Sequence, residues 1–188
     1  MDVIKKAFIG YDLGDGDTIT DFVVIDMRSP GIYEFKDMEM PDSNSPGQAI
    51  PTAYAYSGDG KIIFASSILE ELDAITDIHN NFKRCPSDLM GKISEERKIS
   101  LLSKFESGFA SESECPDAYS DEMNTFRKSV ITFTNAIFED KKYKEKIRSE
   151  IDECDDLVFC VGHPIKWSDL DVAIYKAILS ESILGNGE

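Results

Sequence analysis

The sequence has no long hydrophobic run and few basic residues, and both shortages restrict its partners. No apolar segment approaches the roughly 18 residues that a membrane-spanning helix needs, and the N-terminal residues lack the apolar core of a secretory signal. The sequence has 20 basic and 36 acidic residues, which gives a formal net charge of −16. This charge repels nucleic acid and anionic lipid surfaces, so we expect neither as a partner. A polyanion such as ATP remains compatible with it, because a metal ion and backbone amides hold phosphates locally.

Cysteine and histidine are also scarce. The four cysteines form no C-x-x-C pair, and there are two histidines. Without closely spaced soft ligands we expect no zinc site, and reduced thiols in the cytoplasm are the simplest interpretation. Cys160 lies inside an apolar run, which predicts a small side chain in the core.

What is present is an ordinary globular mixture. The 188 residues are 41% hydrophobic and 30% charged, which argues against disordered and fibrous classes. This length suffices for one domain that buries its core without disulfides or metals.

The first part of the chain predicts strands. Residues 7–13 are mostly apolar, a Gly/Asp turn follows, and residues 18–26 are rich in β-branched side chains, which is the pattern of a β-hairpin. The alternation of residues 32–36 adds a third strand. Residues 50–56 and 61–65 flank a Ser-Gly-Asp-Gly turn and predict a second hairpin.

A short helix and a surface region follow the second hairpin. Ser67 is a candidate N-cap for a helix whose apolar residues fall near a helical period. These residues are Ile68, Leu69, Leu72 and Ile75. The pattern weakens over residues 88–117, which predicts a loop-rich surface region with a helical segment near residues 95–105.

The C-terminal part predicts helices around one strand. Apolar residues recur at spacings of three and four between Met123 and Phe138, which predicts a long amphipathic helix. A shorter helix is expected over residues 144–154, and another begins at Ser168. The apolar run Leu157–Gly162 predicts a buried strand. This order favours an α/β fold, with a mixed sheet, an N-terminal β-hairpin and packed helices.

The segment from Ile9 to Thr18 is the main candidate for chemistry. Its strand carries Asp12 near the end, and the chain then turns through Gly14 and Gly16. Glycines allow backbone amides to approach a phosphate closely. Asp12 is suited to bind Mg²⁺ through its water shell or to polarise an attacking water, and Thr18 offers a hydroxyl. A purely structural hairpin turn has the same composition, and this segment alone leaves both interpretations open.

This segment and three later ones resemble, in the same order, the motifs of one known family. Residues 50–56 resemble an xPSxVAF strand, and Asn80–Arg84 is similar to an N-T-x-x-x-x-K-R segment. After the long helix, Leu157–Trp167 resembles a V-x-x-V-P-A-x-[FW] strand end, and Gly10–Gly16 resembles a G-[IT]-D-L-G-[TG]-T phosphate loop. With this order and spacing, the chain resembles the actin-like ATPase superfamily, and most closely the N-terminal lobe of the seventy-kilodalton heat-shock chaperone ATPases.

The resemblance implies a ribonuclease H-like lobe that binds ATP and Mg²⁺. It implies that Asp12 organises the Mg²⁺ shell and that Lys83 assists γ-phosphate hydrolysis. The phosphate loop would comprise Gly14, Asp15, Gly16, Asp17 and Thr18. Residues 1–188 would then be the first lobe of a longer cytoplasmic chaperone ATPase, inactive alone. Its partners would be the second lobe, protein clients and co-chaperones.

Departures from the family pattern keep alternatives open. The family has hydroxyl residues after D-L-G where this chain has Asp15 and Asp17, and two acids repel a triphosphate unless a cation bridges them. Gly162-His163-Pro164 replaces Pro-Ala, and no second phosphate loop follows Trp167. A non-hydrolysing interaction module and a small-molecule kinase of the same superfamily are therefore the alternatives. Lys83 is either a site lysine or, together with Arg84, part of a solvated basic pair on the surface.

Overall fold

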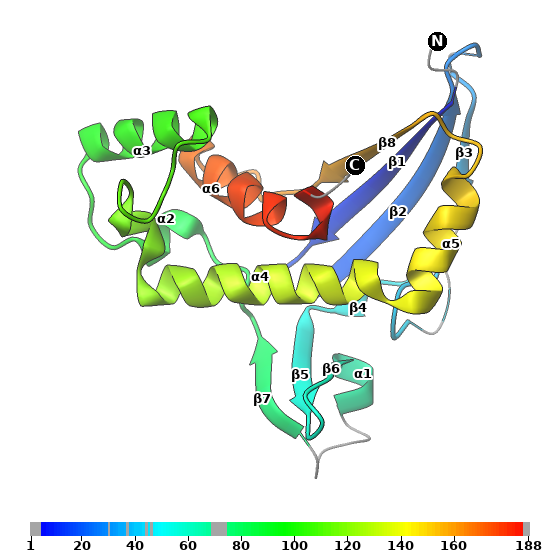
Figure 1. Ribbon diagram of the computed structural model, residues 1–188, viewed down its shortest axis with the longest axis horizontal. Coiled ribbons are helices and arrows are strands. Elements are labelled where there is room, and N and C mark those ends of the chain that lie inside the picture. Colours follow the sequence, from blue (N-terminus) through cyan, green and yellow to red (C-terminus); the bar gives the residue numbers. More distant parts are fainter. Residues whose placement is uncertain are drawn as a thin grey trace. The chain divides into compact units, whose positions relative to one another are not determined.

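The computed structural model describes residues 5–29, 31–36, 38–43, 45, 47–68 and 75–185 (Figure 1). The chain divides into two compact units, and each is described by itself. Unit 1 comprises Met1–Asn81 and Ala136–Gly162, and unit 2 comprises Phe82–Asn135 and His163–Glu188. Among the described helices of both units, none is long and apolar enough to cross a membrane.

The larger sheet of unit 1 mixes antiparallel and parallel pairs. β1 (Lys5–Leu13) pairs antiparallel with β2 (Asp17–Asp26), which pairs antiparallel with β3 (Tyr33–Lys36). On its other side β1 pairs parallel with β8 (Asp156–Val161), so the strand order is β3-β2-β1-β8 (Figure 1). The expected α/β fold with a mixed sheet and an N-terminal hairpin is therefore confirmed.

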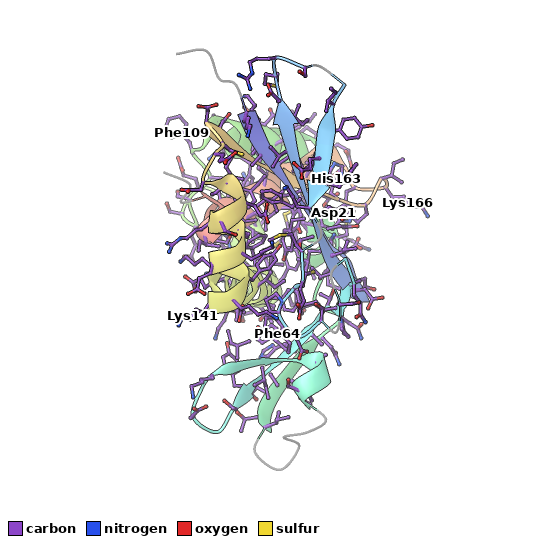
Figure 2. The ribbon with its side chains drawn as sticks, turned by 90° about the vertical axis from the view of Figure 1, so that its right-hand side faces the viewer. Asp21, Phe64, Phe109, Lys141, His163 and Lys166 are labelled. Carbon is purple, nitrogen blue, oxygen red and sulfur yellow. The ribbon has the colours of Figure 1, made fainter. Side chains whose placement is uncertain are left out.

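One face of this sheet is covered by helices and forms the core of unit 1. Four alternate residues of β1 are buried on it: Ala7, Ile9, Tyr11 and Leu13. The end of α4 (Asp121–Glu139) packs there, because the Phe138 ring lies 5.3 Å from that of Tyr11 and 5.6 Å from that of Phe159. α5 (Lys141–Ile151) lies along the same face (Figure 2), with the Tyr143 hydroxyl 2.5 Å from the Thr20 hydroxyl. Both helices were expected from the sequence.

β8 is not the buried strand that its apolar run predicted. None of its residues is buried, and Cys160 is exposed, so the expectation of a core cysteine was wrong. Continuous apolar runs are typical of strands covered on both faces. Here β8 pairs with β1 on one side only within the described residues, and at the edge of the sheet its side chains stay partly accessible.

A second sheet of unit 1 contains the predicted second hairpin. β5 (Ala53–Ser57) lies between β6 (Ile62–Phe64) and β7 (Ile75–Asn80). The strand expected over residues 50–56 is split, because β4 (Ile50–Pro51) pairs with β2 in the first sheet. The break comes at Thr52, which connects the two sheets.

The helix expected after this hairpin is shorter than predicted. α1 spans Ala65–Ile68, and Ile75 belongs to β7, so its assignment to the helix was wrong. Leu69 and Leu72 lie outside the described residues. Because β-branched Ile75 and Thr76 suit a strand, the helical spacing of Ile75 was accidental.

Unit 2 is built from helices. α3 (Glu95–Ser107) begins after Ser94, whose hydroxyl accepts the Arg97 N–H, and ends at Gly108 in the left-handed region. This confirms the helical segment expected near residues 95–105, and it buries Leu101 and Phe105. The other helices are α2 (Pro86–Leu89), the first part of α4, and α6 (Asp169–Ser180), with short 3₁₀ turns at Pro116–Tyr119 and Ile183–Gly185.

Asp171 ties the start of α6 to α2. Its carboxylate accepts hydrogen bonds from the Ser168 N–H at 2.9 Å and hydroxyl at 2.5 Å, and from the Ser87 N–H at 2.7 Å. Burial by itself would raise the pKa of this carboxyl, but the hydrogen bonds from Ser168 and Ser87 together outweigh it and lower the pKa. The ionised carboxylate therefore stabilises the folded unit.

We expect Asp171→Ala to lower the free energy of unfolding by about 2 to 4 kcal/mol, because two partly buried N–H groups lose a charged acceptor. Since the folded pKa lies below the ordinary value of 3.8, this stabilisation is present above that value and is lost as the pH falls through the folded pKa. Urea unfolding at pH 7 and pH 3 measures both effects. Asp169→Ala, an exposed acid in the same turn, is the control, and an equal loss there would contradict the assignment.

Candidate functional site

The carboxyl ends of β1 and β8 lie side by side, because the two strands are parallel neighbours. Asp12 is exposed near the end of β1, and Gly162 directly follows β8, donating its N–H to the Tyr11 carbonyl at 2.9 Å. A Cβ on Gly162 would lie 3.1 Å from Asp12 Oδ1. The absence of a side chain at Gly162 thus leaves the space that the Asp12 carboxylate occupies.

This strand end is a place where α/β sheets commonly bind ligands. Such ligands bind beyond the carboxyl ends of strands. From β1 the chain turns to β2 on one side, while β8 lies on the other side (Figure 1). Asp12 therefore lies near the carboxyl end of β1, between its antiparallel neighbour β2 and its parallel neighbour β8.

The turn after Asp12 is tight and closed. The Gly14 N–H donates to the Asp17 carbonyl at 3.0 Å, and a Cβ on Gly14 would overlap that carbonyl oxygen. The Gly16 carbonyl accepts the Thr52 N–H at 2.8 Å, which holds the turn against β4. Asp15, Gly16 and Asp17 are exposed, so this part of the expected phosphate loop faces solvent.

Thr18 lies on the inner side of the same segment. Its side chain is fully buried, and its hydroxyl lies 2.7 Å from the Thr52 hydroxyl. The structure thus separates the five expected loop residues by exposure. Thr18 anchors the hairpin to β4, whereas Asp15, Gly16 and Asp17 form the surface.

Lys83 belongs to unit 2 and is held by aromatic rings. Its side chain is 8% exposed, and its ammonium lies 5.6 Å from the ring centroid of Trp167 and 5.5 Å from that of Tyr175. Cation–π contacts of this kind favour the charged ammonium. The alternative of a solvated basic pair is wrong for Lys83, whereas its neighbour Arg84 is exposed.

Trp167 and Tyr175 are the residues that the sequence did not connect with Lys83. Their rings meet edge to face at 5.2 Å, at the beginning and in the middle of the α6 region. Trp167 lies just before α6 and Tyr175 within it, and no local pattern pairs either residue with a lysine so distant in the chain. Only the fold of unit 2 brings the three side chains together.

The structure brings Asp12 and the Gly14–Thr18 turn together in unit 1 and places Lys83 in unit 2. A separation of about 6–12 Å between the ends of the Asp12 and Lys83 side chains, room for a hydrated ion and a phosphate, stays a prediction. Among the described residues, no group of three or more His, Cys, Asp or Glu side chains is placed to hold a metal ion. Mg²⁺ bound with phosphates needs only one or two protein carboxylates and keeps several waters, and Asp12 supplies one.

The chain was also compared with known protein families, with curated proteins and with solved structures. None of these comparisons found a match. The function of the chain is therefore inferred from the residues and geometry of its own two units.

Proposed function

We propose that this chain is the ATP-binding first lobe of a cytoplasmic, chaperone-like ATPase of the actin-like superfamily, with a ribonuclease H-like sheet. The observation that supports this most is the position of Asp12, which is exposed near the carboxyl end of β1, beside Gly162 and just before the Gly14 turn. A carboxylate at this point can hold the water shell of Mg²⁺ while the turn faces the phosphates. The order of the four family-like segments supports the same proposal.

The roles of the two candidate catalytic residues differ. Asp12 would bind Mg²⁺ through water, and Lys83 would place positive charge beside the γ-phosphate and the attacking water. Phosphoryl transfer depends mainly on positioning and charge stabilisation, and an ammonium already fixed by Trp167 and Tyr175 needs little reorganisation. Further carboxylates would come from a second lobe, so this chain alone should not turn over ATP. Clients and co-chaperones would be the other partners.

A second candidate function is a non-hydrolysing interaction module that keeps the hairpin. Asp15 and Asp17 are exposed on the turn and would repel a triphosphate, and the Thr18 hydroxyl is already engaged with Thr52. In that case the turn is purely structural. Nucleotide binding that depends on Asp12 separates the two candidates.

Titration of the 188-residue chain with ATP, with and without Mg²⁺, tests the proposal by ³¹P NMR. We expect weak, Mg²⁺-dependent binding with a dissociation constant on the order of 0.1 to 1 mM, since one wall of a cleft makes few contacts. Asp12→Asn should weaken binding about tenfold and remove the Mg²⁺ dependence, because the carboxylate charge is lost. Gly162→Ala should weaken it less, by crowding the Asp12 carboxylate.

The control is Asp21→Asn. Asp21 lies on β2, opposite Gly10 of β1, and its exposed carboxylate is on the same face of the sheet as that of Asp12. We expect this substitution to leave binding unchanged. Equal weakening by both substitutions would show a general charge effect and argue against an Asp12 site. Micromolar affinity of this chain alone for ATP would contradict the proposal that it supplies only one wall of the binding cleft.

A further inference from the structure

The sheet of unit 1 has a second face, which we call the open face, opposite the one covered by α4 and α5. Strand register places its side chains in rows that cross four strands. One row is Phe35, Val23, Phe8 and Val158. The next row is Tyr33, Ile25, Lys6 and Asp156. None of these residues is buried, in contrast to the residues of the covered face.

The open face is apolar where it is most exposed. The side chains of Phe35 and Tyr33 are 68% and 58% exposed, and their rings meet edge to face at 5.6 Å. An antiparallel sheet can leave one face in water, but that face is then usually polar. The row from Phe35 to Val158 is apolar on all four strands, and Tyr33 of the next row extends its exposed aromatic end. Such a patch indicates a surface that another layer covers.

We propose that the open face binds an amphipathic helix of a partner protein. The apolar side of this helix would lie on the row of Phe35, Val23, Phe8 and Val158, and Lys or Arg residues would line its flanks. Four strands about 4.8 Å apart make the row about 14 Å wide, which suits one helix about 10 Å in diameter. The flat footprint of the two rows is on the order of 200 Å², which one helix covers, whereas a stable dimer buries roughly 800 Å² of accessible surface per partner. The area therefore favours a helix over a second copy of this chain.

Charge supports the same occupant. The chain carries −16, so a second copy is repelled, whereas a cationic helix is attracted. Asp21, on the side of the sheet away from α5 (Figure 2), borders the apolar row of Phe35, Val23, Phe8 and Val158. Within the second row Asp156 pairs with Lys6 at 2.9 Å, so these two charges offset each other. The exposed carboxylate of Asp21 would meet the basic flank of the helix.

Cys160 provides a reporter on this face. It is exposed on β8 and lies opposite Gly10, in the row next to Phe8 and Val158. A helix on the open face would cover its thiol. Cys85 and Cys154, which are half-buried, and Cys115, which is buried, serve as internal references.

The test uses a synthetic helix of about 18 residues with leucines on one side and lysines on the other, long enough to form a helix. At saturation we expect it to slow maleimide labelling of Cys160 about tenfold, located by mass spectrometry, while labelling of Cys85 and Cys154 stays unchanged. The same peptide with glutamate in place of lysine should bind at least tenfold more weakly. Equal binding of both peptides, or an unprotected Cys160, would overturn the proposal.

Variants place the binding on the apolar row. Phe35→Ser should weaken the peptide at least tenfold, whereas Phe109→Ser, which removes a phenyl ring that is 71% exposed in unit 2, should leave its affinity unchanged. An unchanged urea-unfolding midpoint of Phe35→Ser shows that the sheet is intact. Light scattering of the chain alone completes the test. A dimer that Phe35→Ser dissociates would reassign the open face to a second copy and overturn the helix.

Discussion

We expect Gly14→Ala to lower the free energy of unfolding by about 3 kcal/mol, which corresponds to a fall of about 6 to 12 °C in the melting temperature. A Cβ at this position overlaps the Asp17 carbonyl oxygen, which belongs to the backbone and cannot move aside as a side chain would. The turn must open, and the hydrogen bond from the Gly14 N–H to Asp17 is lost with it. Thermal and urea unfolding followed by circular dichroism measure the change.

Gly16→Ala is the matched control, two residues away in the same turn. A Cβ on Gly16 meets nothing within 4 Å, so we expect a change within about 0.5 kcal/mol. A small effect at Gly14 would mean that the turn opens easily. The position of Asp12 directly before it would then be less fixed than the structure indicates.

The hairpins could be predicted because their causes are local. β-branched residues on both sides of a Gly/Asp turn favour strands, and the same turn chemistry recurs before Lys61. The long helix α4 was predicted for a similar reason, since its apolar spacing lies within one segment. Each of these elements is determined by residues close to one another in the sequence.

The partial exposure of β8 could not be predicted, because it depends on what lies beside and above the strand. Its apolar run is compatible with a central strand covered on both faces, yet in the described sheet it has β1 on one side only. The exposure of Cys160 follows from that position. A sequence pattern identifies the strand but not its neighbours.

The candidate site shows the same division. The exposure of Asp12 and the turn after it follow from the hairpin pattern. Thr18, in contrast, is paired with Thr52 across 34 residues, and Lys83 is held by two rings more than 80 residues further along. Such contacts decide whether a hydroxyl or an ammonium is available to a ligand, and they arise only when the chain folds.

In a protein that includes the second lobe, we expect Lys83→Met to lower kcat about 10²-fold with little change in nucleotide affinity. Methionine keeps an unbranched stem between Trp167 and Tyr175, so the substitution removes the charge while filling most of the same space. A charge that acts on the transition state lowers kcat, whereas a charge that only attracts ATP raises KM. Single-turnover hydrolysis together with nucleotide titration separates the two effects.

Arg84→Met is the control for this prediction, because it removes a neighbouring positive charge that is exposed. We expect its kcat within about twofold of the parent protein, since exposed charges contribute little. If both substitutions lowered kcat equally, the effect would come from the local field and not from a placed ammonium. If Lys83→Met left kcat unchanged in a folded protein, Lys83 would be a structural residue of unit 2, bound to its two aromatic rings, and the non-hydrolysing module would be the better function.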